Sequence, residues 1–194
     1  MKRITDYIVP WVRNAAPYSD KHMDFAWAHP EVARMMSNEN PIPPSDAVID
    51  AIVQAAQKGN LYPGSGEELR RRLGEAAGLQ AENVLLGNGS TDIINIVLNT
   101  FLAPGDEAII PFPTFSMYEA RVRVNGGVPI VIPIGPPPDF YWDIEGILAA
   151  VNDKTRLIFI CTPNNPTGNQ IREPDLRQIL DLGLPTFIDE AYYE

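Results

Sequence analysis

The sequence has one cysteine, Cys161, two histidines and no long hydrophobic run. A single cysteine excludes an internal disulfide and a zinc site built from several cysteines. The histidines, His22 and His29, do not have a spacing typical of metal ligands, so we expect no metal site. No apolar stretch approaches the roughly 20 residues that a membrane-spanning helix needs. The N-terminal residues MKRITDYIVPWV lack the apolar segment of about 7–15 residues found in a secretory signal, so we expect a cytoplasmic protein.

Positive charge is also scarce. The chain has 15 Lys and Arg against 25 Asp and Glu, which gives a formal net charge of -10 and a pI of about 4.6. This balance argues against a nucleic-acid-binding surface. The only basic run, Arg70–Arg72, stands beside Glu67, Glu68 and Glu75. We interpret that run as one solvated face of a helix.

The chain is long enough, at 194 residues, for one core or for one domain plus an arm. Residues 1–44 show no clean periodicity, and their aromatic side chains are scattered among polar residues and prolines. We therefore predict an N-terminal arm over 1–44 that packs on something else, either in cis or on a second subunit. The rest, 45–194, is predicted to form the domain.

From residue 83 onward, short apolar runs alternate with segments of helical pattern. The predicted strands are Val84–Leu86, Glu107–Ile110, Val128–Pro133, Arg156–Cys161 and Thr186–Asp189. The predicted helices are Asp46–Lys58, Glu67–Ala77, Ser90–Phe101, Thr114–Asn125, Ile144–Val151 and Pro174–Leu182. Ser45 is a candidate N-cap, and Gly59 and Gly78 are candidates for helix ends. Strands that alternate with single helices predict an α/β fold with three layers, α/β/α, around a mostly parallel sheet.

A glycine turn, Gly87–Asn88–Gly89, leads from one of these strands into a helix that begins Ser90–Thr91–Asp92. Glycine permits a tight turn, and the helix start offers hydroxyls and amide N–H groups to an anion such as phosphate. The same residues are compatible with a plain strand-to-helix turn that has a serine cap. The pattern is neither a Walker loop nor the dinucleotide-binding fingerprint.

Three further residues are candidates for a ligand site. Asp189 ends an apolar strand, and a buried carboxylate needs a partner, for which a protonated heterocycle nitrogen is as suitable as an N-cap or a salt bridge. Asn165, in the run Asn164–Gly168, follows another strand, although a turn alone also explains that run. Phe115 is able either to stack on a flat ring or to pack in the core.

Six segments occur here in an order and spacing that resemble the fold-type I, class I/II pyridoxal-phosphate aminotransferases. They are NENPIPPS (38–45), LYPGSGEELRRRLG (61–74), GNGSTD (87–92), PTFSMYEA (113–120), CTPNNPTG (161–168) and FIDEAYYE (187–194). The likeness is greatest to the histidinol-phosphate branch. The segment VRNAAPYS (12–19) also resembles the N-terminal arm of that branch. It covers nearly the whole chain.

That resemblance implies a pyridoxal 5'-phosphate site. Asp189 would pair with the pyridinium nitrogen, and Asn165 and Tyr192 would hydrogen-bond the 3-oxygen of the ring. Phe115 would stack on the ring. The phosphate would be held by Gly89, Ser90 and Thr91. Tyr62 would reach the phosphate of a neighbouring subunit, which implies a homodimer, and Tyr18 would lie near the substrate.

The family's lysine that forms a Schiff base with the cofactor has no match in this chain, because Lys2, Lys21, Lys58 and Lys154 all precede Asp189. We therefore expect an inactive N-terminal part of an aminotransferase, without the C-terminal part of the large domain and without the small domain. No catalytic residue is assigned. The parent would transfer an amino group from an amino acid or histidinol phosphate to a 2-oxo acid such as 2-oxoglutarate. A pyridoxal-phosphate decarboxylase or lyase, and a non-catalytic truncated chain, remain as alternatives.

Overall fold

The computed structural model describes residues 2–13, 15 and 21–194, which form two compact units. The first unit consists of 1–16 and 87–194, and the second consists of 17–86. The boundary predicted between the arm and the domain, after residue 44, stays a prediction. Tyr18 lies outside the described residues.

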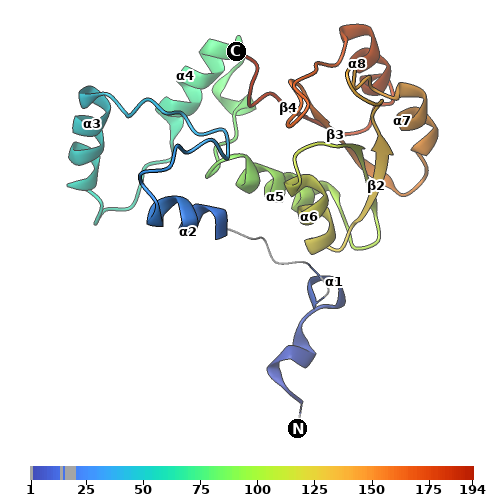
Figure 1. Cartoon of the computed structure of the whole chain (residues 1–194), viewed down its shortest axis with the longest axis horizontal. Helices are drawn as coiled ribbons and strands as arrows, with labels where there is room; N and C mark the ends of the chain where they lie inside the picture. The colour runs from blue at the N-terminus through green and yellow to red at the C-terminus, as the bar shows by residue number, and fades with distance from the viewer. Residues whose placement is uncertain (1, 14, 16–20) are drawn as a thin grey trace. The chain divides into compact units, whose positions relative to one another are not determined.

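The first unit contains a four-stranded parallel sheet in the order β2-β1-β3-β4 (Figure 1). Its strands are β1 (Glu107–Phe112), β2 (Val128–Pro133), β3 (Thr155–Cys161) and β4 (Thr186–Asp189). Helix α5 (Ser90–Phe101) precedes β1, and the connecting helices are α6 (Met117–Val124), α7 (Ile144–Ala150) and α8 (Glu173–Leu180). The predicted α/β architecture is therefore confirmed, and most of its elements differ from the prediction only at their ends.

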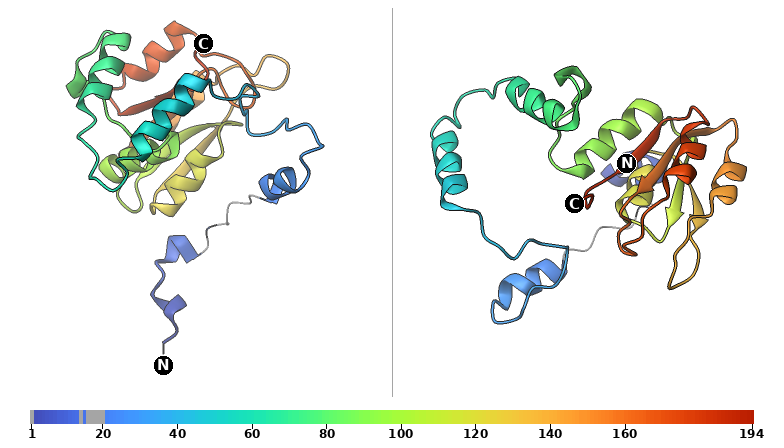
Figure 2. Two further views of the ribbon diagram at one scale, coloured as in Figure 1. Left: turned by 90° about the vertical axis from the view of Figure 1, so that its left-hand side faces the viewer. Right: turned by 90° about the horizontal axis from the view of Figure 1, so that it is seen from above.

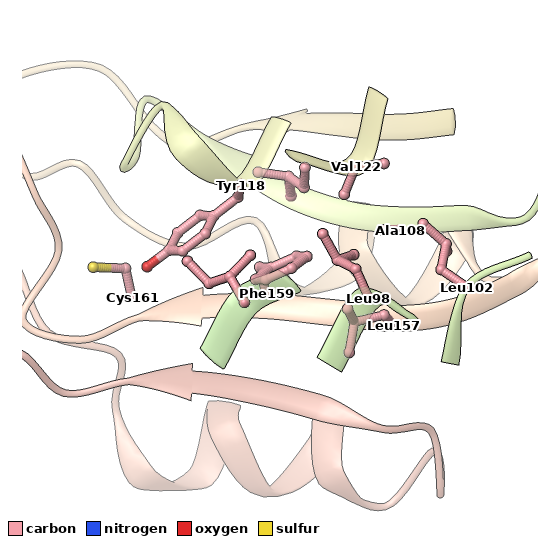
Figure 3. Packing of buried hydrophobic residues seen from close by; sticks show 10 residues of the cluster. Leu98, Leu102, Ala108, Tyr118, Val122, Leu157, Phe159 and Cys161 are labelled. Atoms are coloured by element: carbon pink, nitrogen blue, oxygen red, sulfur yellow. The ribbon is translucent and has the colours of Figure 1, made fainter. Parts of the chain in front are cut away.

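Both faces of the sheet are covered by helices, as the two further views in Figure 2 show. The side chains of each strand alternate between the two faces, because successive residues of a strand point to opposite sides. One apolar cluster joins the sheet to α5 and α6, and its buried members are Ile94, Leu98, Leu102, Ala108, Ile110, Tyr118, Val122, Leu157, Phe159 and Cys161 (Figure 3). The other joins the sheet to α7 and α8, with Ile109, Ile134, Trp142, Ile147, Ile158, Ile160, Ile171 and Ile179. Burial of each large apolar side chain contributes about 1.5–3 kcal/mol, so these two layers fix the sheet.

The strand predicted at Val84–Leu86 is wrong. Val84 has extended backbone angles, but the segment pairs with no strand among the described residues and follows a short 3-10 helix, η2 (Ala81–Asn83). An apolar run becomes a strand only where a neighbouring backbone accepts and donates its hydrogen bonds. The prediction rested on apolar character alone.

The helix predicted from Thr114 begins later, at Met117. Strand β1 runs on through Phe112, and the Thr114 side chain bonds to Asn164 in another loop. Residues 113–116 therefore form the connection between β1 and α6 rather than the first turn of the helix.

The N-terminal segment of the first unit carries η1 (Ile4–Tyr7) and α1 (Pro10–Arg13). Helix α1 contacts α6, and a Cβ atom added at Gly126 would lie 3.1 Å from the Trp11 ring. Part of the predicted arm thus packs in cis against the turn that ends α6.

The second unit contains α2 (Lys21–Ala28), α3 (Asp46–Ala56), α4 (Glu67–Ala77) and η2. The Ser45 carbonyl accepts the Val48 and Ile49 amides at the start of α3, which ends before the predicted Lys58. Gly78 ends α4 in the left-handed conformation, as predicted. Arg71 pairs with Glu68 and Glu75, as expected of a solvated face. None of the described helices is long and apolar enough to cross a membrane.

Candidate functional site

The first unit has a pocket lined by Ser90, Phe115, Cys161, Asn165, Asp189, Ala191 and Tyr192. Ser90 begins α5, Cys161 and Asp189 are the last residues of β3 and β4, and the others stand in the segments that follow β1, β3 and β4. The chain leaves β1 toward β2 on one side and leaves β3 toward β4 on the other, so the order of strands reverses between β1 and β3. Parallel α/β sheets bind ligands outside the carboxyl ends of the strands at such a reversal.

Asp189 is the last residue of β4 and lies beside Cys161, the last residue of β3, in the parallel register. Its side chain is buried and receives two hydrogen bonds. The Tyr118 hydroxyl donates to Oδ2 at 2.7 Å, and the Ala191 amide donates to Oδ1 at 3.0 Å. No Lys, Arg or His among residues 2–13, 15 and 21–194 forms an ion pair with it. The carboxylate thus has neutral donors on the protein side and faces a pocket.

The loop after β3 is fixed by Asn164, which is 3% exposed. Asn164 Nδ2 donates to the Pro113 carbonyl at 2.9 Å and to Thr167 Oγ1 at 2.6 Å, while Asn164 Oδ1 accepts from Thr114. The next residue, Asn165, is half-buried and lines the pocket. The hydrogen bonds of the buried Asn164 thereby set the position of the pocket residue Asn165.

An aromatic stack lies behind the pocket. Phe115 lines the pocket and meets Tyr118 edge-on, with ring centroids 5.5 Å apart. Tyr118 stacks on Phe159 at 4.7 Å, with an angle of 17° between the rings. Phe115 also packs against the apolar cluster, so the two interpretations left open by the sequence are both compatible with its position.

The start of α5 offers free amide groups. Gly89 has φ 77° and ψ 174°, a conformation that is open almost only to glycine. The amides of Asp92 and Ile93 donate to the Gly89 carbonyl, whereas those of Ser90 and Thr91 have no acceptor within the described part of the chain. Such amides, together with the positive end of the helix dipole, suit an anion.

Burial favours the neutral form of two groups near Asp189. Burial, reinforced by the hydrogen bond to Asp189, raises the pKa of Tyr118 far above its usual value. Burial likewise raises the pKa of the Cys161 thiol. Figure 3 shows the hydroxyl end of Tyr118 directed toward the Cys161 side of the cluster. The phenol therefore remains a hydrogen-bond donor to the carboxylate.

Of the residues predicted for the site, the structure brings five to this pocket: Ser90, Phe115, Asn165, Asp189 and Tyr192. Gly89 and Thr91 flank Ser90 in the chain. Tyr62 belongs to the second unit, where its side chain is fully exposed. No group of His, Cys, Asp or Glu side chains in the described residues is arranged to hold a metal ion.

Sequence reasoning missed Cys161, Ala191 and the buried partner Tyr118. Cys161 ends a predicted strand, so its place beside the other strand ends was available from the pattern. Tyr118 follows Phe115 by three residues, a spacing that places both on one side of the helix predicted from Thr114. Its bond to Asp189 joins residues 71 apart and had no sequence signal.

Comparison with known proteins decides the family. The Aminotransferase class I and II family matches residues 30–194. The chain belongs to this family. Members of the family use pyridoxal 5'-phosphate as their cofactor.

Two curated histidinol-phosphate aminotransferases show how far the likeness extends. The one from Dehalococcoides mccartyi is 46% identical over 136 residues, which is 70% of this chain and 37% of the relative. The one from Desulfitobacterium hafniense is 36% identical over 197 residues, covering 98% of this chain and 53% of the relative. The chain thus spans about half or less of the length of these relatives.

Solved structures agree on the fold. The aspartate aminotransferase from Thermotoga maritima has a TM-score of 0.82 at 22% identity, covering 94% of this chain and 54% of that chain. The N-succinyldiaminopimelate aminotransferase from Mycobacterium tuberculosis has a TM-score of 0.82 at 24% identity, covering 95% and 52%. At these identities the likeness concerns the fold alone.

Proposed function

We propose that this chain supplies the cofactor pocket of a pyridoxal-phosphate-dependent aminotransferase. The observation that carries the proposal is the buried Asp189, which faces a pocket and has only neutral hydrogen-bond donors around it in the described residues. A buried carboxylate without a cationic partner is costly. A ligand with a protonated ring nitrogen removes that cost.

The residues present fit pyridoxal 5'-phosphate in three respects. Asp189 offers a carboxylate to the ring nitrogen, and Phe115 offers an aromatic face at the same pocket. Ser90 and Thr91 offer amides without acceptors in the described residues to a phosphate. This cofactor requires three features of a protein: an acid for its ring nitrogen, an aromatic face for its ring and an anion site for its phosphate.

Within that proposal each side chain has a role. Asp189 keeps the ring nitrogen protonated through a charge-assisted hydrogen bond, and Asn165 and Tyr192 hydrogen-bond the 3-oxygen of the ring. Gly89 permits the turn that presents Ser90 and Thr91 to the phosphate. When bound, the cofactor supplies an electron sink for a carbanion at the substrate.

The proposed reaction moves an amino group from an amino acid or histidinol phosphate to a 2-oxo acid such as 2-oxoglutarate. Its support is the name of the curated relatives together with the resemblance of residues 12–19 to the arm of the histidinol-phosphate branch. We extend the proposal to a cytoplasmic homodimer, in which Tyr62 reaches the phosphate in the neighbouring subunit and Tyr18 lies near the substrate. In this proposal, 45–194 is part of the large domain and 1–44 is the arm.

The test uses the protein expressed from the complete reading frame that contains these residues. Its amino transfer from histidinol phosphate to 2-oxoglutarate is followed by glutamate formation, with Asp189→Asn as the variant. We expect turnover in the wild type and a loss of at least about a hundredfold in the variant, since breaking a buried charged pair costs about 3–5 kcal/mol. Release of carbon dioxide without glutamate would favour a decarboxylase, and near-normal turnover of the variant would show that Asp189 is structural.

A further inference from the structure

Tyr118 touches Asp189 but does not line the pocket. Its side chain is 0% exposed, and its hydroxyl donates to Asp189 Oδ2 at 2.7 Å. The other carboxylate oxygen accepts from the Ala191 amide at 3.0 Å. Since a carboxylate oxygen accepts more than one hydrogen bond, these two donors fix the group and still leave lone pairs for a ligand.

The ring of Tyr118 is held on three sides. It stacks on Phe159, meets Phe115 at 5.5 Å, and meets Phe187 at 6.3 Å, both edge-on. A side chain packed in this way has one position, so the donor to Asp189 has one direction. The same ring supports Phe115. The positions of two pocket residues, Phe115 and Asp189, therefore depend on the buried Tyr118.

No charged side chain in the described residues competes for Asp189. Burial and the bond to Asp189 raise the pKa of Tyr118, so its hydroxyl keeps its proton. A neutral donor steadies the carboxylate without neutralising its charge, unlike an arginine or lysine. The negative charge thus remains available to a cationic ligand.

We propose that Tyr118 is a positioning residue that holds the Asp189 carboxylate in the orientation that recognises a protonated ring nitrogen. The proposal rests on the function proposed above. Tyr118 acts through Asp189 and does not touch the ligand. Its contribution is therefore specific to ligands that carry the ring nitrogen, whereas a purely structural residue would affect every ligand of the pocket alike.

Two ligands test that difference. One is 4'-deoxypyridoxine 5'-phosphate, which has no aldehyde and cannot react with surface lysines. The other is its 1-deaza analogue, with C–H in place of the ring nitrogen. The ratio of their dissociation constants, measured by calorimetry, reports the contact with the ring nitrogen. We expect the wild type to prefer the nitrogen ligand, and Tyr118→Phe to reduce that preference about tenfold, the scale of one hydrogen bond to a charged group.

Tyr141→Phe is the matched control, because Tyr141 is 60% exposed and also loses only a hydroxyl. It should leave the preference unchanged. Replacement of Tyr118 by 4-aminophenylalanine restores a donor at the same place and should restore the preference, which also separates a lost donor from disturbed folding. An unchanged or larger preference in Tyr118→Phe, or no rescue by the amine, would overturn the proposal. Equal binding of both ligands by the wild type would instead refute the proposed contact of Asp189 with the ring.

Discussion

The Thr114 hydroxyl donates to Asn164 Oδ1 at 2.7 Å, across 50 residues of sequence. Each of these residues directly precedes a pocket residue, since Phe115 follows Thr114 and Asn165 follows Asn164. The bond therefore ties the loop after β1 to the loop after β3. It thereby fixes the pocket residues Phe115 and Asn165 relative to each other.

We expect Asn164→Ala to lower the free energy of unfolding by about 1–3 kcal/mol, because it leaves the half-buried partners of Asn164 unsatisfied. Urea unfolding followed by circular dichroism measures the change. Asn99→Ala is the control, since Asn99 is an exposed residue of α5, where alanine favours the helix. An equal loss in both variants would contradict this role of Asn164.

Gly89→Ala should weaken the binding of phosphate. A side chain at φ 77° is strained by about 1–3 kcal/mol, and relief of that strain moves the Ser90 and Thr91 amides. The ratio of dissociation constants of pyridoxine and pyridoxine 5'-phosphate measures the contribution of the phosphate. We expect that ratio to fall about tenfold in Gly89→Ala, the scale of a lost hydrogen bond to a charged group.

Gly105→Ala provides the matched control, because Gly105 also has a positive φ, 91°, with open space around its added Cβ. It carries the same kind of backbone strain away from the pocket. The same fall in both glycine variants would mean that the phosphate is not held at the start of α5.

Cys161 should react slowly with thiol reagents. Burial raises the pKa of its thiol, so at pH 8 the folded chain contains less thiolate than the unfolded chain, and the thiolate is the reactive form. Because Cys161 is the only cysteine, its reaction with a chromogenic disulfide reports on this site alone. We expect faster reaction in urea and further slowing when 4'-deoxypyridoxine 5'-phosphate is bound. Unchanged kinetics with saturating ligand would place that ligand elsewhere.

The 194-residue chain by itself should show no sustained amino transfer above that of free cofactor. Its four lysines all precede Asp189, and Lys154 directly precedes β3, at the opposite end of that strand from the pocket. Glutamate formation by the purified chain with added pyridoxal 5'-phosphate is the measurement. Turnover that persists through many cycles would contradict the lysine assignment implied by the family.

Much of the fold was predictable because its signals are local. Glycine and proline mark the ends of α4 and α5, and apolar runs give β2 and β4 with the observed bounds. Val84–Leu86 shows the limit of local signals. A strand also needs a neighbouring strand to pair with, and a local sequence pattern does not reveal that this neighbour is missing. The polar residues at strand ends predicted that Asp189 and Asn165 belong to one site, and both line the pocket. The Tyr118 donor escaped prediction because it depends on how α6 approaches the end of β4.

The central claim is that Asp189 binds a ring that carries a protonated nitrogen, and the lining of its pocket lies within one compact unit. The most direct test is calorimetric titration of the chain with 4'-deoxypyridoxine 5'-phosphate, for the wild type, Asp189→Asn and the exposed control Asp181→Asn. The account predicts saturable binding at one site, weakened about 10- to 100-fold by loss of the Asp189 charge and unchanged by loss of the Asp181 charge. Equal affinity of the wild type and Asp189→Asn, or no saturable binding to the wild type, would contradict it.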